Sequence, residues 1–185
     1  MEVRGDPIAQ RVEKVSSNPP AAIAAIVSTA APVKEAVSTT PGYTATGFDK
    51  LSGYAFEVSD DLLGPITNDL AAATATMKTD AMIPQPVHAL NNKPVAIKGF
   101  MLPLKVEGGV VTELLIMKDQ SMCCYGTTPR INEWISVKMK NKGVKPLMDQ
   151  PVTLFGTLHV GETRENGYLV GIYRLDGERM ETPEE

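Results

Sequence analysis

The sequence predicts a mainly β fold, in which residues 84–177 form one small closed β-barrel. Three observations predict it: five segments rich in β-branched and apolar residues, turn dipeptides between them, and glycines inside strand-like segments. A chain of 185 residues can bury one proper hydrophobic core, so we expect one domain with appendages.

Residues 1–42 are rich in Ala, Pro, Ser, Thr and Val and contain no aromatic residue. Such a composition does not offset the entropy lost on ordering, so we expect a disordered tether. The apolar residues 21–33 follow Pro19-Pro20 and lack the basic leader of a signal peptide. No run approaches the roughly 20 apolar residues of a membrane-spanning helix, so no transmembrane segment is expected.

Residues 43–83 predict a short α/β prelude that packs on the barrel. The alternation in residues 54–58 (YAFEV) indicates a short strand. Residues 60–77 fit a turn and a short helix, which Gly64-Pro65 divides into two pieces. One apolar face of this helix can be formed by Leu62, Ile66, Leu70 and Ala73.

The barrel strands follow one another along the chain. We expect them at residues 94–104, 110–118, 133–139, 151–160 and 168–175. Gly99 stands where a bulge or sharp bend would lie, Gly108-Gly109 supplies a turn, and Asn166-Gly167 is a type I′ turn signature. Five strands with one longer connection suit an oligonucleotide/oligosaccharide-binding (OB) barrel better than a sandwich, which needs about seven strands. Residues 178–185 are expected to form a frayed acidic tail.

Charge is distributed unevenly within a net charge of -4. Residues 1–83 carry 6 basic and 10 acidic side chains, whereas residues 84–177 carry 11 and 8. This excess is too small to indicate a nucleic-acid partner by itself. A local basic cluster, made of Arg130, Lys138, Lys140, Lys142 and Lys145, keeps that partner open.

Four strings carry a family resemblance. They are GFMLPL (99–104), MCCYG (122–126) with INEWISVKM (131–139), PVTLFGTLHVGE (151–162) and NGYLVGIYRLDG (166–177). With them, residues 43–180 resemble an uncharacterised bacterial family of OB-like proteins, which are often exported or lipid-anchored. The resemblance implies the fold and a periplasmic or envelope location, and it implies no activity. The lack of a clear signal peptide indicates the cytoplasm instead, so both locations stay open.

Cys123 and Cys124 are the only cysteines, and they are adjacent. Their Cα atoms, about 3.8 Å apart, are too close for an ordinary disulfide, which spans roughly 4.4–6.8 Å. One interpretation is that both thiols pack as small apolar side chains. A second joins them to His88 and His159 in a zinc or copper(I) site with soft ligands. A third makes one of them a redox-sensing thiol beside a basic side chain.

A barrel that binds single-stranded nucleic acid presents aromatic platforms within a basic groove. Trp134 and Lys138 share one face of the strand at 133–139, and Tyr125 and Arg130 come from neighbouring sequence. These four are the candidate ligand-binding residues. Trp134 is equally explained as a core aromatic that closes the barrel.

The sequence contains no serine nucleophile elbow, no pair of catalytic carboxylates and no phosphate-binding glycine loop. We therefore predict a non-catalytic binding or accessory protein with no established cofactor. Zinc or copper binding, thiol redox chemistry and single-stranded nucleic-acid binding are the alternatives. A protein partner stays open, because sequence does not separate apolar contact residues from core residues.

Overall fold

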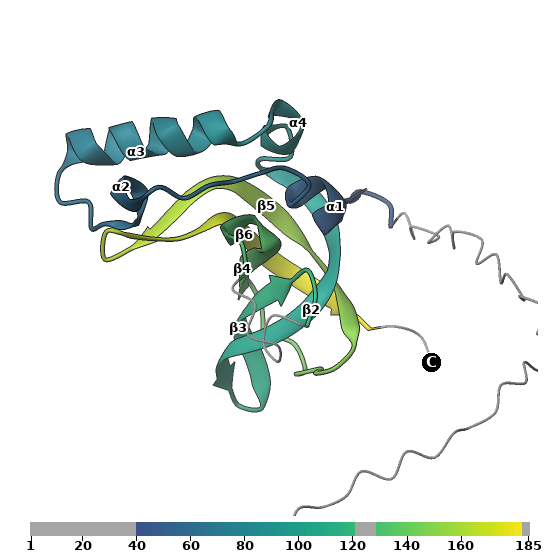
Figure 1. Ribbon diagram of the computed structural model, residues 1–185. Coiled ribbons are helices and arrows are strands. Elements are labelled where there is room, and N and C mark those ends of the chain that lie inside the picture. The colour runs from purple at the N-terminus through teal and green to yellow at the C-terminus, as the bar shows by residue number, and fades with distance from the viewer. Residues whose placement is uncertain (1–39, 121–128, 183–185) are drawn as a thin grey trace, which may run out of the picture. The chain divides into compact units, whose positions relative to one another are not determined.

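The computed structural model describes residues 40–120 and 129–182 (Figure 1). Strands make up most of the fold. Apart from one two-residue strand at the start, they follow the α-helices along the chain. The elements in order are β1 (Thr44–Ala45), α1 (Phe48–Leu51), α2 (Asp60–Leu63), α3 (Asp69–Met82), α4 (Gln85–His88), β2 (Lys93–Glu107), β3 (Val110–Met117), the 3-10 turn η1 (Ile131–Glu133), β4 (Trp134–Met139), β5 (Pro151–Glu165) and β6 (Tyr168–Glu181).

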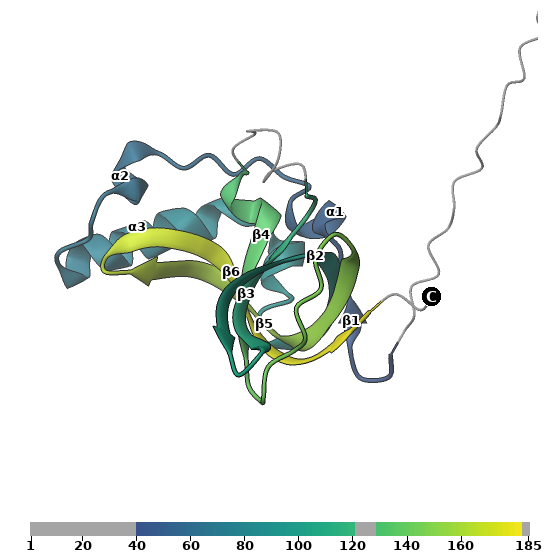
Figure 2. The same ribbon diagram turned by 90° about the horizontal axis from the view of Figure 1, so that it is seen from below.

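The strands form one six-stranded mixed sheet in the order β1-β2-β3-β4-β6-β5. β2 also pairs with β5, so the pairings of β2, β3, β4, β6 and β5 close into a ring. β4 and β6 are parallel, as are β1 and β2, and the other pairs are antiparallel. In Figure 2 these strands curve around a common interior.

The interior of the ring is filled by aliphatic side chains. Successive residues of a strand point to opposite faces, so every second side chain of the ring strands turns inward. The largest fully buried aliphatic residues of the strands are Ile97, Leu114, Ile116, Ile135, Leu154, Leu158, Ile172 and Leu175. Val144 and Leu147, from the connection between β4 and β5, pack against the same core.

Tyr173 of β6 binds the end of α1 and the segment that follows it. Its side chain is fully buried, and its hydroxyl donates a hydrogen bond to the Leu51 carbonyl at 2.8 Å. The Tyr54 hydroxyl lies 2.7 Å from the Tyr173 hydroxyl oxygen. Asn132 donates from Nδ2 to the Tyr54 carbonyl at 3.0 Å, so polar side chains satisfy backbone groups that no strand partner meets.

β5 and β6 continue beyond the ring as a two-stranded arm, formed by residues 161–165 and 168–172. Helices α2 and α3 cover this arm (Figure 1). The carboxylate of Glu162 in the arm accepts hydrogen bonds from Thr76 at 2.6 Å and Thr79 at 3.2 Å. Arg164 pairs with the same carboxylate at 3.3 Å and donates to the Leu62 carbonyl at 3.2 Å. Polar contacts therefore hold α3, whose buried side chains are only Ala75 and Thr79.

All five predicted barrel strands are present as strands, and the break at Gly64-Pro65 is confirmed between α2 and α3. Asn166 and Gly167 have φ values of 51° and 86°, as a type I′ turn requires. Two expectations about the prelude were wrong. Residues 54–58 are not a strand, because Phe56 packs into the core while the side chain of Asn132 in η1 binds the Tyr54 carbonyl. Leu70 is 79% exposed, because α3 turns its alanine and threonine side chains toward the arm.

Two further expectations need correction, the first in part. The sharp bend expected as one alternative at Gly99 stays a prediction, but the bulge was wrong, since Gly99 pairs in regular register with Val152. A glycine is required at this position because a Cβ there would lie 2.6 Å from the Met117 carbonyl oxygen. Residues 178–181 belong to β6 rather than to a frayed tail, and Glu181 pairs with Thr153. The predicted tether lies outside the described residues except for its last three positions. Within the part of the chain described, no helix is both long and apolar enough to cross a bilayer.

Candidate functional site

The outer face of β4 presents a line of polar and aromatic side chains. Ile135, Val137 and Met139 point into the ring and are buried. Trp134, Ser136 and Lys138 alternate with them and therefore point outward, with Trp134 and Ser136 half-buried and Lys138 exposed.

The strand register places side chains of β6 and β5 beside this line. Ser136 is opposite Arg174, and Arg174 is opposite His159. One step along the strands, Lys138 is opposite Asp176, which is opposite Thr157. Residues directly opposite one another share a face of the sheet. We call the resulting surface the polar face; it consists of Trp134, Ser136, Lys138, Thr157, His159, Arg174 and Asp176.

His159 and Asp176 form the strongest contact on the polar face. Nε2 of His159 lies 2.9 Å from Oδ2 of Asp176, and each side chain is about one third exposed or less. Burial raises the pKa of Asp176, but the His159 hydrogen bond and the positive charges of Arg174 and Lys140 outweigh it, and the pKa is lowered. Asp176 is therefore ionised at neutral pH and fixes the orientation of the imidazole.

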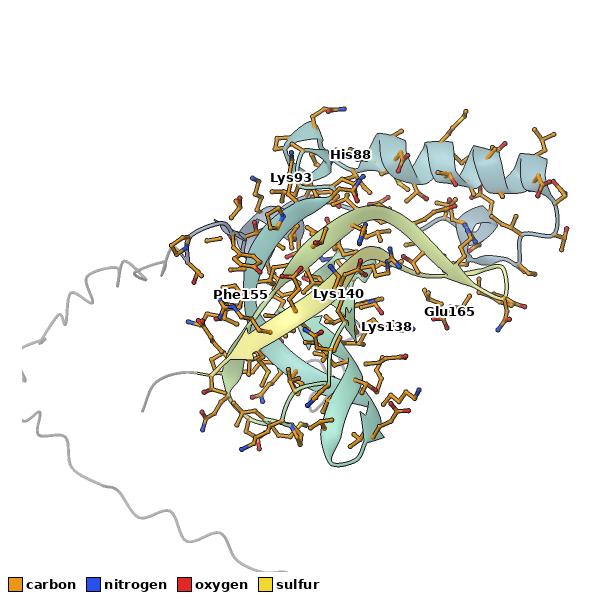
Figure 3. The ribbon with its side chains drawn as sticks, turned by 180° about the vertical axis from the view of Figure 1, so that it is seen from behind. His88, Lys93, Lys138, Lys140, Phe155 and Glu165 are labelled. Atoms are coloured by element: carbon orange, nitrogen blue, oxygen red, sulfur yellow. The ribbon has the colours of Figure 1, made fainter. Side chains whose placement is uncertain are left out.

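Most cations around the polar face already have a carboxylate partner. Lys138 lies 3.9 Å from Glu113, and Lys140 lies 3.2 Å from Glu178. Figure 3 labels both lysines; Lys138 belongs to β4 and Lys140 directly follows it. Arg174 is exposed, and no carboxylate of the described residues lies within ion-pair distance of it. It is thus the arginine of this face whose hydrogen-bond donors are available to a ligand.

A shallow depression of about 340 Å³ adjoins the polar face where the arm leaves the ring. Its lining residues are His159, Val160, Gly161, Glu162, Thr163, Arg164 and Arg174. The register of β5 and β6 shifts between Val160 and Thr163, and Gly161 has a φ of 142°. This irregularity, together with the missing side chain of Gly161, shapes the hollow.

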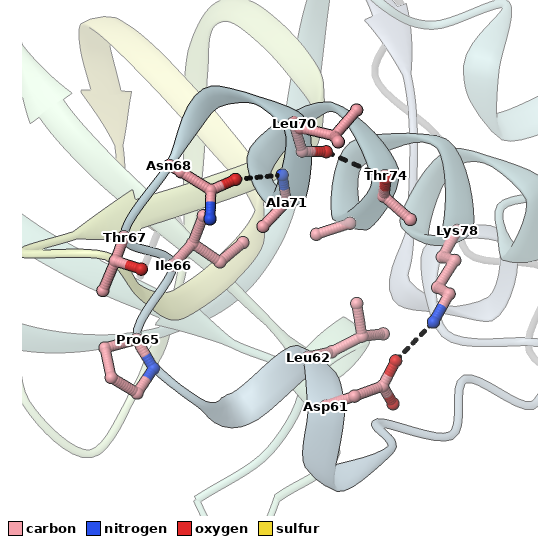
Figure 4. Close-up of a pocket in the computed structure, with 11 residues that line it drawn as sticks. Asp61, Leu62, Pro65, Ile66, Thr67, Asn68, Leu70, Ala71, Thr74 and Lys78 are labelled. Carbon is pink, nitrogen blue, oxygen red and sulfur yellow. Dashed lines mark hydrogen bonds and ion pairs between the residues drawn. The ribbon is translucent and has the colours of Figure 1, made fainter.

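A larger hollow of about 470 Å³ lies between α2 and α3 (Figure 4). Its charged lining residues, Asp61 and Lys78, pair with each other at 2.5 Å. Asn68 caps α3 by accepting a hydrogen bond from the Ala71 amide at 2.8 Å. The charged and capping groups there are thus already engaged with the protein, so the polar face is the better candidate site.

The polar face lacks the geometry of a serine hydrolase. Ser136 and His159 lie on either side of β6, and two strand spacings separate their backbones by about 9.5 Å. A general base must lie roughly 3 Å from the nucleophile it activates. The serine and histidine of this face therefore do not act as a nucleophile and base pair.

Of the four residues of the predicted metal site, the structure describes only the two histidines, and each of them has another polar partner. Cys123 and Cys124 lie outside the described residues. Nε2 of His88 lies 2.9 Å from the Asp80 carbonyl oxygen, and His159 contacts Asp176. No group of three or more His, Cys, Asp or Glu side chains suited to a metal occurs in residues 40–120 and 129–182. The zinc or copper site remains a prediction.

Of the predicted ligand-binding residues, Trp134 and Lys138 share the polar face. Arg130 stands before η1, where its guanidinium pairs with Glu133 at 2.7 Å and donates to the Ser52 carbonyl at 3.3 Å. Tyr125 lies outside the described residues. Sequence reasoning missed Arg174, although its alternation with the buried Tyr173 and Leu175 was a usable signal.

The fold and the site define a small, mainly β protein with a polar outer face and no recognisable catalytic centre among the described residues. Residues 50–182 match the family described as "Protein of unknown function (DUF3299)". The chain belongs to the DUF3299 family, which agrees with the expected membership of a family without assigned function.

Several chains of solved structures match this chain, among them the following two. A DUF3299 family protein from Pseudomonas aeruginosa PAO1 is 21% identical with a TM-score of 0.53, over 77% of this chain and 97% of that chain. A putative aspartyl-tRNA synthetase from Leishmania major Friedlin is 11% identical with a TM-score of 0.38, over 82% of this chain and 23% of that one. The first likeness supports the fold alone, and the second is too weak to carry an argument. No curated protein matches the chain.

Proposed function

We propose that the chain is a non-catalytic binding or accessory protein of OB type, and that the polar face is its contact surface. The strand order supports the OB assignment. β2, β3 and β4 form an antiparallel meander, β6 joins β4 in parallel, and β5 closes the ring onto β2. This order is expected of a five-stranded Greek-key barrel of the OB type, which binds its ligands on the face of its second and third strands. These strands correspond to β3 and β4 here, so the polar face shares β4 with that binding face.

One observation carries the functional proposal: the register of β4, β6 and β5 gathers an aromatic side chain, an arginine with available donors and a histidine on one face. Aromatic and arginine side chains dominate binding energy at recognition surfaces. The separation of Ser136 from His159 favours binding over hydrolysis.

Nuclear magnetic resonance mapping tests the proposal. The isotope-labelled protein is titrated with a fragment library that contains anionic, cationic, sugar-like and aromatic compounds. We expect shifts of backbone amides to concentrate on β4, β6 and the adjoining part of β5. Shifts concentrated on the hollow between α2 and α3, or no binding by any class, would contradict the proposal.

An enzyme assay on the native sequence and one variant tests the proposal that the protein is non-catalytic. Hydrolysis of chromogenic ester and phosphate substrates is measured for the native sequence and for His159→Gln. We expect no turnover above buffer in either. Turnover that disappears in His159→Gln would instead make the face catalytic.

Single-stranded nucleic-acid binding is the second candidate, because Trp134 and Lys138 lie on one face with Ser136 between them. The ion pairs of Lys138 and Lys140 reduce the net positive charge there. Anisotropy of labelled oligo(dT) distinguishes this candidate: binding that weakens steeply with salt and is lost in Trp134→Ala supports it. Binding insensitive to either change contradicts it.

We also propose a location in the bacterial cell envelope, which rests on the family resemblance alone. Fractionation of cells that express the native gene tests it. Recovery of the protein with periplasmic or membrane markers supports the proposal, and recovery with cytoplasmic markers contradicts it.

A further inference from the structure

We propose that Arg174 and His159 form a binding site for a carboxylate group at the shallow depression beside the polar face. This inference rests on the proposed binding function and names the chemistry of the ligand. It assigns Arg174 as the anchor and His159 as the second donor.

Arg174 is the starting point, because its charge is not neutralised by an ion pair within the described residues. Arg130, Arg164 and Arg179 pair with Glu133, Glu162 and Glu181, respectively. An exposed guanidinium offers five N–H donors in a rigid planar fork, which matches the two oxygens of a carboxylate. Arg174 also lines the depression itself.

The neighbours of Arg174 extend the site. His159 and Ser136 are its direct cross-strand neighbours on either side, so both side chains start about 5 Å from it. The Nε2 atom of His159 is engaged with Asp176. Its Nδ1 atom makes no hydrogen bond with any described residue, so a protonated imidazole can offer this second N–H to a ligand.

The surrounding charges favour a monoanion over a dianion. Asp176 is held ionised beside His159, and the Glu162 carboxylate lies at the edge of the depression. The oxygens of Glu162 are engaged with Thr76, Thr79 and Arg164, so its charge is partly compensated. A phosphate dianion would meet like charges at short range, whereas a carboxylate brings one charge in the planar geometry that arginine binds best.

The size of the depression sets a limit on the ligand. Its volume of about 340 Å³ is at the small end of ligand pockets, which span roughly 300–1,000 Å³. Gly161 has no side chain to fill it, and the positive φ there disfavours other residues. A small organic acid or a single acidic side chain suits this space.

The experiment titrates the full chain with butyrate, a monocarboxylate, and with inorganic phosphate, and follows backbone amides of β5 and β6 by nuclear magnetic resonance. We expect butyrate to shift amides around Arg174 and His159 and to bind more tightly than phosphate. Arg174→Gln should weaken butyrate binding at least about tenfold, as expected for a lost charge-assisted hydrogen bond. Arg174→Lys keeps the charge but lacks the fork, and it should recover little of that loss.

Lys145→Gln is the matched control, because it removes one exposed positive charge from the connection between β4 and β5. It should bind butyrate as the native sequence does, and circular dichroism should show that both glutamine variants are folded. Equal weakening by Arg174→Gln and Lys145→Gln, or phosphate binding tighter than butyrate, would overturn the proposed site. Fragments that still bind the polar face in that case would leave the proposed function standing.

Discussion

The buried hydroxyl of Tyr173 gives the sharpest test of how the segment after α1 is held. Replacing Tyr173 with Phe removes one oxygen and leaves the ring in place. The Leu51 carbonyl then loses its donor at 2.8 Å, and the Tyr54 hydroxyl loses its partner at 2.7 Å. Tyr173 is fully buried, so water does not replace the lost partners freely.

The expected cost follows from these two lost contacts. Each neutral hydrogen bond contributes about 0.5–1.5 kcal/mol, so Tyr173→Phe should lower the free energy of unfolding by about 1–3 kcal/mol. For a domain of this size, each 1 kcal/mol lowers Tm by about 2–4 °C. Urea unfolding followed by fluorescence measures the change, because Trp134 is the only tryptophan. Tyr168→Phe is the control, since Tyr168 is 51% exposed and its hydroxyl contacts no described residue.

The pH dependence provides a second readout of the same contact. Burial and the hydrogen bond with Tyr54 raise the pKa of Tyr173 above its ordinary value of 10.0. A raised pKa stabilises the folded state below pH 10 and loses this contribution at higher pH, as the unfolded tyrosine ionises first. The stability gap between the native sequence and Tyr173→Phe should therefore narrow above about pH 10. Equal stability of Tyr173→Phe and Tyr168→Phe at neutral pH would refute the reasoning.

Three other changes have defined outcomes. Glu162→Gln should speed hydrogen exchange in α3 and lower stability by about 1–3 kcal/mol, because it weakens a buried ion pair, whereas the exposed Glu165→Gln should change neither. Gly156→Ala should destabilise by more than about 3 kcal/mol in thermal melts, since its Cβ would lie 2.2 Å from a β6 carbonyl oxygen, while Gly64→Ala meets nothing closer than 3.9 Å. The hydrogen bond from an arginine lowers the pKa of Glu133, although burial opposes this shift. The ionised Glu133 therefore adds stability above its ordinary pKa of 4.5, and this contribution is lost as the pH falls. In a plot of urea midpoint against pH, Glu133→Gln should flatten the decline on the acid side. Unchanged hydrogen exchange in Glu162→Gln, an unchanged thermal melt of Gly156→Ala, or an unchanged acid slope in Glu133→Gln would contradict the corresponding prediction.

The candidate site shows where sequence reasoning stopped. Alternation placed Trp134 and Lys138 on one face of their strand, and the structure agrees. Residue type suggested that His159 joins His88 and the cysteines at a metal, and this stays a prediction because both cysteines lie outside the described residues. The fold shows a neighbour that residue type did not indicate, since His159 lies on the face of Trp134 and pairs with Asp176.

The positions of the strands and their turns could be predicted from the amino-acid sequence because they are local properties. Alternation sets which side chains share a face within one strand, and Asn166-Gly167 sets a tight turn through its positive φ values. The closure of β2 onto β5 and the row Ser136, Arg174 and His159 could not be predicted in this way. The row depends on the register of three strands far apart in the chain, which packing of the whole core fixes, and a shift of one residue would turn every side chain of a strand to the opposite face.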